Sequence, residues 1–231
     1  MSDSPKKGID FAMVLASSVH DMKNSVGMLL ASLDQLMESA PPKDESQSRQ
    51  YSTLSYEASR INNELVQLLT VYRMQNEFLP LRIDEHYIVD IFEEQIARNH
   101  TLIETRDISL DMDCDHDLNW YFDRDLVSSV IHNVLINGIR YTSNKIVLSA
   151  KVENDMLVLS VADNGSGYPP SMLDRPSCGV EDAEVSKDGT HLGLYFAERI
   201  AEMHKEKNRH GFIKLSNDSD IGGGLFSLYI P

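Results

Sequence analysis

With 231 residues, of which 42% are hydrophobic and 25% are charged, the chain has the composition of an ordinary globular protein with one large domain or two small ones. Its formal net charge of −15 argues against direct binding to nucleic acid or to an anionic membrane. The sequence has neither an apolar run long enough to cross a bilayer nor a signal-type apolar core after Met1. Cys114 and Cys178 form no CxxC pair, which favours reduced thiols. We therefore expect a soluble, cytoplasmic protein.

The N-terminal third of the sequence predicts two long amphipathic helices. The first runs from about Ile9 to Glu38 and ends before Pro41 and Pro42, because paired prolines cannot continue a helix. A short polar loop is expected at 43–48. In both helices the apolar positions alternate between spacings of three and four: Ala12, Leu15, Val19, Met22, Val26, Leu29, Leu33 and Leu36, then Tyr51, Leu54, Ala58, Ile61, Leu65, Leu68 and Tyr72.

Two helices of similar length joined by a short loop form an antiparallel hairpin. One hairpin leaves much of its apolar stripe open to water, whereas two hairpins packed as a four-helix bundle would cover it. We therefore expect a homodimer built on this bundle.

The pattern changes at Leu79-Pro80, which predicts a helical hairpin domain over residues 1–78 and a second domain over residues 79–231. In the second domain the expected strands are 81–83, 108–112, 145–152, 156–162, 212–216 and 225–230, and the expected helices are 86–105, 123–141 and 192–204. The Pro- and Gly-rich stretch 168–188 is expected to be a loop. This order predicts an α+β fold, in which a helical hairpin is followed by a mixed sheet covered by helices on one face, an α/β sandwich.

The first candidate site lies near the front of the first helix. His20 is followed directly by the carboxylate of Asp21, and Asn24 lies one helical turn further on. Because His20 is one residue off the apolar seam, its side chain should point outward. An exposed histidine is most often a solvated residue, so this segment alone does not establish a function.

A second pattern is set aside. The alternating residues Asp111, Asp113, Asp115 and Asp117 resemble the start of a calcium-binding loop. The sixth position of such a loop requires a glycine and the twelfth a bidentate glutamate, but this sequence has His116 and Phe122 there. A strand end followed by a solvated loop is the better interpretation.

Three short segments in the second domain have residues suited to binding a nucleotide. The first is the helical stretch 133–142, where Asn133, Asn137 and Arg140 share one face by their spacing. An asparagine oxygen can ligate a hard cation such as Mg²⁺, and an arginine one turn later can contact a phosphate. In isolation, these side chains could equally cap the helix or pack against a neighbour.

The other two segments lie at a strand end and at a helix start. Asp163 directly follows a predicted strand, and its carboxylate can accept a hydrogen bond from an exocyclic amine. The glycines Gly165 and Gly167 allow the backbone to approach a planar ring closely. The turn 189–194 opens a helix, whose first backbone amides and dipole suit phosphate groups. Each segment has an ordinary structural explanation as a turn, but their shared order favours a nucleotide site.

Taken together, these segments resemble the core of a bacterial sensor histidine kinase. The hairpin is similar to the dimerisation and histidine-phosphotransfer domain, with residues 20–24 as its H box. The second domain resembles the catalytic ATP-binding domain shared with gyrase-type ATPases, with residues 133–142 as the N box, 163–167 as the G1 box and 189–194 as the G2 box. The final residues, 222–231, resemble the closing strand of that domain.

The resemblance implies a set of functional residues. The catalytic residues would be His20, Asp21 and Asn24. The nucleotide-binding residues would be Asn133, Asn137, Arg140, Tyr141, Asp163, Gly165, Gly167, Gly189, Thr190, Gly193 and Leu194. Asn137 would ligate Mg²⁺ with Asn133 in support, and ATP and Mg²⁺ would be the cofactors. Because Asn133 stands where related ATPases have a water-activating glutamate, transfer to a side chain would be favoured over hydrolysis.

The sequence departs from the family pattern in four places. No proline follows Asn24, Gly138 stands where alanine is usual, and His191 fills a position that is normally glycine. The loop 168–188 is short and lacks the phenylalanine of a typical F box. These departures bear on the shape of the lid and on the rate of the kinase reaction.

The function implied by the resemblance is autophosphorylation of His20 from Mg-ATP, followed by transfer to an aspartate of a response regulator. Asn24 would assist the reverse reaction, dephosphorylation of that regulator. With only about ten residues expected before the first helix, we expect the sensory input to come from a separate sensor protein, or alternatively from a sensor domain that precedes this sequence in a longer chain. Two alternatives are a non-catalytic phosphotransfer or docking protein with a degenerate ATP-binding domain, and a serine kinase of anti-sigma type.

Overall fold

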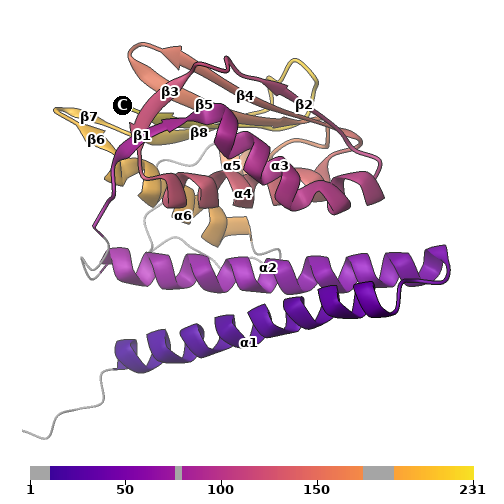
Figure 1. The fold of residues 1–231 in the computed structure, drawn as a ribbon. Helices are drawn as coiled ribbons and strands as arrows, with labels where there is room; N and C mark the ends of the chain where they lie inside the picture. The colour runs from indigo at the N-terminus through magenta and orange to yellow at the C-terminus, as the bar shows by residue number, and fades with distance from the viewer. Residues whose placement is uncertain (1–10, 76–79, 174–189) are drawn as a thin grey trace, which may run out of the picture. The chain divides into compact units, whose positions relative to one another are not determined.

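The computed structural model describes residues 11–75, 80–173 and 190–231, and the chain divides into two compact units, Met1–Leu79 and Pro80–Pro231 (Figure 1). The first unit is a pair of helices. The second unit consists of a mixed sheet with helices on one of its faces. The predicted fold class is therefore confirmed: two N-terminal helices precede an α/β domain with a mixed five-stranded sheet.

In the first unit, helix α1 (Phe11–Ser39) and helix α2 (Glu45–Gln75) lie side by side and antiparallel (Figure 1). Helix α2 begins within the segment 43–48 that was expected to be a loop, so that expectation was wrong. The cause is local capping: the backbone N–H of Gln47 donates to Asp44 Oδ1 at 2.8 Å, and its own side chain accepts from the N–H of Lys43 at 2.9 Å.

The apolar stripe of the hairpin is wider than the contact between its two helices. Val19 is buried, at 4% exposure, and Ala58, Leu69 and Val71 are buried on α2. Other members of the predicted seams are exposed: Met22, Leu29 and Leu36 on α1, and Leu54, Ile61 and Leu68 on α2. One hairpin therefore covers only part of its apolar surface.

The second unit is organised around a five-stranded sheet in the order β2-β4-β5-β9-β8. Its strands are β2 (Ser109–Asp113), β4 (Lys145–Glu153), β5 (Met156–Asp163), β9 (Leu225–Ile230) and β8 (Phe212–Ser216). Only β2 and β4 pair in parallel, and the other neighbours are antiparallel. Strands β4 and β5 form a hairpin whose turn residues Asn154 and Asp155 both have positive φ, the conformation of a tight two-residue turn.

Helices α3 (Ile88–Thr105), α4 (Arg124–Tyr141) and α6 (Thr190–Met203) cover one face of this sheet (Figure 1). Alternate residues of each strand point toward the helices, as the period of two requires. In the neighbouring strands β5 and β9 these residues are fully or almost fully buried, namely Leu157, Leu159, Val161, Phe226, Leu228 and Ile230. Burial of each such side chain stabilises the fold by roughly 1.5–3 kcal/mol, so this layer forms the core of the unit.

Several small elements differ from the sequence prediction. Strand β1 is Asp84–Tyr87 rather than 81–83, because it pairs with a strand that the sequence did not reveal, β3 (Asn119–Phe122). The short pair β6 (Lys205–Glu206) and β7 (Arg209–His210) was also not predicted. A short helix, α5 (Pro170–Leu173), lies inside the expected loop 168–188. The remainder of that loop, 174–188, lies outside the described residues.

The start of α4 is fixed by a buried junction between Asp123 and His204. Asp123 caps α4, since its Oδ1 accepts from the N–H of Leu126 at 3.1 Å, and its Oδ2 accepts from the N–H of Arg82 at 2.8 Å. The Asp123 N–H donates to His204 Nε2 at 3.0 Å, while His204 Nδ1 donates to the carbonyl of Ile200 at 2.8 Å. Burial lowers the pKa of His204, which matches an imidazole that must stay neutral to make both bonds.

A second buried histidine, His132, should make the stability of the second unit sensitive to acid. His132 on α4 is 6% exposed, its Nδ1 lies 3.4 Å from Asn99 Nδ2 on α3, and burial together with the charge of Arg98 lowers its pKa from 6.5 to about 4. Because the folded-state pKa is the lower one, the neutral form is favoured on folding. This contribution is complete above pH 6.5 and is lost as the pH falls to about 4, for a total of about 3 kcal/mol.

The measurement is urea unfolding followed by the fluorescence of Trp120, the single tryptophan of the chain, which reports on the second unit alone. Between pH 6.5 and pH 4, the unmodified chain should lose about 3 kcal/mol more of its free energy of unfolding than His132→Gln. The matched change His116→Gln, at an exposed histidine, should keep the steep dependence. Equal losses in the chain and in His132→Gln would contradict the prediction.

Candidate nucleotide-binding site and phosphoacceptor

The second unit contains a cavity of about 380 Å³ between α4, the end of β5, the loop that follows β5, α5 and α6. Its walls combine apolar side chains with a few polar groups, the usual composition of a small-molecule site. The lining residues that matter below are Val134, Asn137, Tyr141, Val161, Asp163, Tyr168, Met172 and Leu194.

Asp163 provides the charged group of this cavity. Its backbone N–H donates to the carbonyl of Gly224 at 2.9 Å, which continues the pairing of β5 with β9 to the last residue of β5. Its Oδ1 accepts from the N–H of Gly165 at 2.8 Å. Burial raises the pKa of the carboxyl, while hydrogen bonds from the backbone of Gly165 and Gly224 oppose that rise. The result is a hydrogen-bond acceptor held rigidly among apolar walls.

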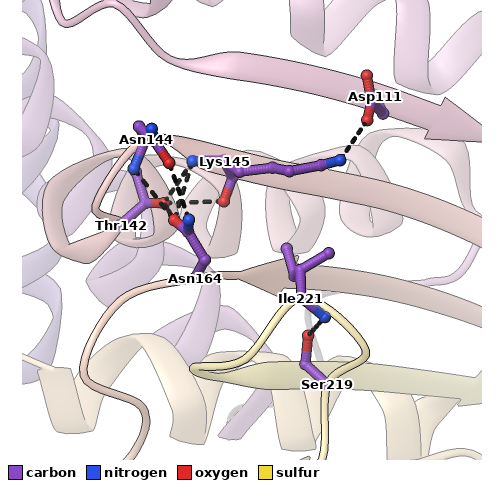
Figure 2. A network of polar contacts seen from close by, with 7 residues as sticks. All are labelled: Asp111, Thr142, Asn144, Lys145, Asn164, Ser219 and Ile221. Carbon is purple, nitrogen blue, oxygen red and sulfur yellow. Dashed lines mark hydrogen bonds and ion pairs between the residues drawn. The ribbon is translucent and has the colours of Figure 1, made fainter.

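The segment after α4 is tied to the end of β5 by the side chain of Asn164 (Figure 2). Its Oδ1 accepts from Thr142 Oγ1 at 2.8 Å, from the N–H of Asn144 at 3.0 Å and from the N–H of Lys145 at 2.9 Å. Its Nδ2 donates to Asn144 Oδ1 at 2.8 Å. Lys145 also forms an ion pair with Asp111 on β2, at 3.0 Å. This network fixes the spacing between α4 and β5, the two elements that contribute Asn137 and Asp163.

The glycines of the site differ in how tightly they are enclosed. A Cβ at Gly165 would collide with the carbonyl oxygen of Tyr141. A Cβ at Gly193 of α6 would collide with the side-chain amide of Asn133. A Cβ at Gly138, in contrast, would make only ordinary contacts, 3.5 Å from Ile146 Cδ1 and 3.9 Å from Val161 Cγ1. The alanine that the family usually has at position 138 would therefore fit here.

The structure brings five of the sequence-predicted nucleotide residues to one cavity: Asn137, Tyr141, Asp163, Gly167 and Leu194. Four others are not among its lining residues: Asn133 and Gly193, which pack against each other, Arg140 and Gly165. The Arg140 guanidinium lies over the ring of Tyr141, 5.1 Å from its centroid. Gly189 and the side chains of Thr190 and His191 lie outside the described residues.

Several contributors to the site were not predicted from the sequence. Tyr168 and Met172 line the cavity but fall in the stretch that was interpreted as a loop. Asn164 and Gly224 stand inside motifs that were recognised, although neither was given a role. The only sequence signal for Asn164 is its place directly after Asp163, while the burial of Tyr168 depends on residues far away in the chain.

The H-box residues lie on the exposed side of α1. His20 has a side-chain exposure of 53%, and its Nδ1 lies 3.5 Å from Asp21 Oδ1 and 3.4 Å from Asn24 Nδ2. The two contacts favour opposite tautomers. A hydrogen bond to Asp21 requires a proton on Nδ1, which leaves the lone pair on Nε2, whereas a bond from the Asn24 amide requires Nδ1 without its proton.

Comparison with known proteins shows which proteins this chain is similar to. Residues 122–231 match the family described as histidine kinase-, DNA gyrase B-, and HSP90-like ATPase. The alginate biosynthesis sensor protein KinB of Pseudomonas aeruginosa is 28% identical over 166 residues, which cover 71% of this chain and 28% of KinB. The virulence sensor histidine kinase PhoQ of Salmonella typhimurium is 23% identical over 207 residues, which cover 90% of this chain and 41% of PhoQ.

The solved structure of the histidine kinase AdeS from Acinetobacter baumannii shares the fold, with a TM-score of 0.55 at 18% identity over 91% of this chain and 96% of that one. Residues 122–231 thus match the ATPase family named above, and the chain as a whole is similar to the sensor histidine kinases KinB and PhoQ. The resemblance inferred from the sequence is confirmed. The chain spans less than half the length of KinB and PhoQ. Across the described ranges, no helix is both long enough and apolar enough to span a membrane.

The contrast between the glycines gives a second prediction. Gly138→Ala should stabilise the second unit by about 1 kcal/mol, because alanine favours the helix interior and its methyl group has room. Gly165→Ala should destabilise it by roughly 1–3 kcal/mol, because the methyl group meets the backbone of Tyr141. Urea unfolding followed by Trp120 fluorescence measures both. A stabilising Gly165→Ala would show that this close approach does not exist.

Proposed function

We propose that this chain is a protein-histidine kinase that phosphorylates its own His20 from Mg-ATP and then transfers the phosphoryl group to an aspartate of a response regulator. In this proposal residues 1–78 form the dimerisation and phosphotransfer domain, and residues 79–231 form the catalytic ATP-binding domain. The single observation that supports it most is that Asn137 and Tyr141 of α4 and Asp163 of β5 line one cavity. The relatedness to sensor histidine kinases supports the assignment of the reaction type.

The nucleobase would occupy the cavity next to Asp163. Its carboxylate accepts a hydrogen bond from the exocyclic amine of adenine, and Val134, Val161 and Leu194 offer apolar contact to the ring. Guanine presents an oxygen acceptor at the position of that amine, so the carboxylate would repel it. These contacts favour ATP over GTP.

The residues present suit a magnesium ion bound to the phosphates. Asn137 lines the cavity, and its amide oxygen is a hard ligand of the kind that Mg²⁺ accepts. Magnesium commonly takes one or two protein ligands and completes its shell with phosphate oxygens and water. When bound, the ion neutralises phosphate charge. Arg140 is one turn from Asn137 and would add a positive charge near the phosphates.

Nε2 of His20 would be the attacking atom. Asp21 favours the tautomer with its proton on Nδ1, which gives Nε2 the lone pair, and it stabilises the positive charge that develops on the ring. A bond forms between Nε2 and the γ-phosphorus while the bond from phosphorus to the β–γ bridging oxygen breaks, and ADP leaves. The Nδ1 proton stays on the ring, bonded to Asp21, or passes to water.

A homodimer is part of the proposal. The exposed apolar residues of α1, Met22, Leu29 and Leu36, recur every seven positions, as do Leu54, Ile61 and Leu68 of α2. A seven-residue repeat makes a continuous stripe along each helix. A second hairpin packed on these stripes would complete a four-helix bundle and cover the surface that one hairpin leaves exposed. A sensor protein that binds the two activity states of the kinase unequally would supply the input.

The third prediction tests the reaction with γ-labelled ATP. The purified chain should acquire label that is stable in base and lost in acid, as a phosphorus–nitrogen bond requires. His20→Gln should reduce this label by about a hundredfold or more and leave ATP binding unchanged. Asp163→Asn should instead weaken ATP binding about ten- to a hundredfold, because the amide loses a charged acceptor.

The outcomes separate the proposal from its alternatives. Acid-stable label would indicate a serine kinase instead. ATP binding without any label would favour the non-catalytic phosphotransfer protein, for which His191 and the short lid are the supporting sequence features. Full label in His20→Gln would assign the phosphoacceptor to another histidine.

The fourth prediction concerns Asn24. Its amide lies one turn from the phosphoacceptor and could position a water molecule at the aspartyl phosphate of the regulator. Asn24→Ala should therefore retain autophosphorylation and slow dephosphorylation of the regulator by about tenfold or more. The control is Ser32→Ala, an exposed change further along the same helix. The measurement is the decay of phosphorylated regulator after each variant is added, and unchanged decay with Asn24→Ala would refute the role.

A further inference from the structure

Tyr168 lies in the same cavity as Asp163, and its backbone is held by the side chain of Asn217, the residue that follows β8. The N–H of Tyr168 donates to Asn217 Oδ1 at 2.7 Å, and Asn217 Nδ2 donates back to the carbonyl of Tyr168 at 2.9 Å. The preceding Gly167 has φ +75°, and a Cβ there would lie 2.7 Å from Asn217 Oδ1. Only glycine satisfies both constraints, so the backbone conformation directly before Tyr168 is fixed.

The side chain of Tyr168 lies near the carboxylate of Asp163, on the other side of Gly224. A Cβ at Gly224 would lie 3.1 Å from Tyr168 Cε2 and 2.9 Å from Asp163 Oδ2. The edge of the phenol ring and the carboxylate therefore flank the same glycine. Burial raises the pKa of the Tyr168 hydroxyl, and the charge of Asp163 raises it further, so the hydroxyl keeps its proton at neutral pH.

The hydroxyl of Tyr168 is available to a ligand. Within the described ranges, no hydrogen bond joins this hydroxyl to another residue, including Asp163. The other tyrosine of the cavity, Tyr141, differs in being 45% exposed and covered by the Arg140 guanidinium. Tyr168 is thus the donor that stands beside the acceptor Asp163 in the cavity.

We propose that the Tyr168 hydroxyl is a second recognition group for the nucleobase, donating a hydrogen bond to the ring nitrogen next to the exocyclic amine that Asp163 accepts. This inference rests on the proposed binding of ATP. The amine of adenine is flanked by two ring acceptors, N1 on one side and N7 on the other. The acceptor Asp163 thus matches the exocyclic amine of adenine, and the donor Tyr168 matches a ring nitrogen beside that amine. The position of Tyr168 on one side of Asp163 means that one ring nitrogen, and not both, receives the bond.

The test compares Tyr168→Phe with the unmodified chain. This variant removes one hydroxyl and keeps the ring. Tyr229→Phe, in which the same hydroxyl is removed from a tyrosine that stacks on Phe212 outside the cavity, is the matched control. Calorimetry measures the affinity of each protein for ATP, for 1-deaza-ATP and for 7-deaza-ATP, each of which lacks one ring acceptor. Thermal unfolding shows that each variant is folded.

The unmodified chain and Tyr229→Phe should bind ATP equally well, and Tyr168→Phe should bind it about three- to tenfold more weakly. One deaza analogue should bind the unmodified chain more weakly than ATP by a similar factor, and that difference should vanish in Tyr168→Phe, because either change removes the same bond. The inference is overturned if Tyr168→Phe binds ATP as the unmodified chain does, or if both deaza analogues keep their full loss in Tyr168→Phe. A folded, unmodified chain that does not bind ATP would overturn the proposed function instead.

Discussion

The side chain of Asn164 is the interaction on which the geometry of the cavity depends. Its oxygen accepts from the Thr142 hydroxyl and from the N–H groups of Asn144 and Lys145, which joins the end of α4 to the end of β5 (Figure 2). One wall of the cavity belongs to α4 and the acceptor Asp163 ends β5. A polar group that satisfies several backbone donors at once is costly to remove, because each donor would lose its partner. The proposed nucleotide recognition would therefore depend on a residue that is not itself among those lining the cavity.

Helix α4 both packs into the core and carries a side chain that lines the cavity. One face carries the fully buried residues Val127, Ile131 and Leu135, which pack into the core, while Asn137 lines the cavity. Its first turn is held by Asp123 and His204, and its last by the network around Asn164. Because both ends are fixed by polar contacts, the helix cannot slide without breaking these hydrogen bonds. Stability and the position of the functional side chains thus share the same contacts.

The two candidate sites have contrasting surroundings. Asp163 and Tyr168 lie in a partly enclosed cavity, where burial raises the pKa of both groups and where a glycine at 224 permits their close approach. His20 is exposed on α1, with Asp21 and Asn24 competing for the same ring nitrogen. Enclosure suits the selective binding of a small molecule, whereas exposure suits a group that must be reached by other proteins. This division agrees with the proposed roles of the two units.

The sequence by itself determined the features that depend on near neighbours in the chain. The spacing of apolar residues predicted the long helices, alternation predicted β4 and β5, and the order of Asn137, Asp163 and Gly193 indicated the nucleotide site. Only the tertiary structure decided the pairing of β1 with β3, the hydrogen bond between Asp123 and His204 and the entry of Tyr168 into the cavity. Each of these depends on partners dozens of residues away, such as Asn217 for Tyr168. Local periodicity contains no information about such partners, because they meet only when the sheet and its helices have assembled.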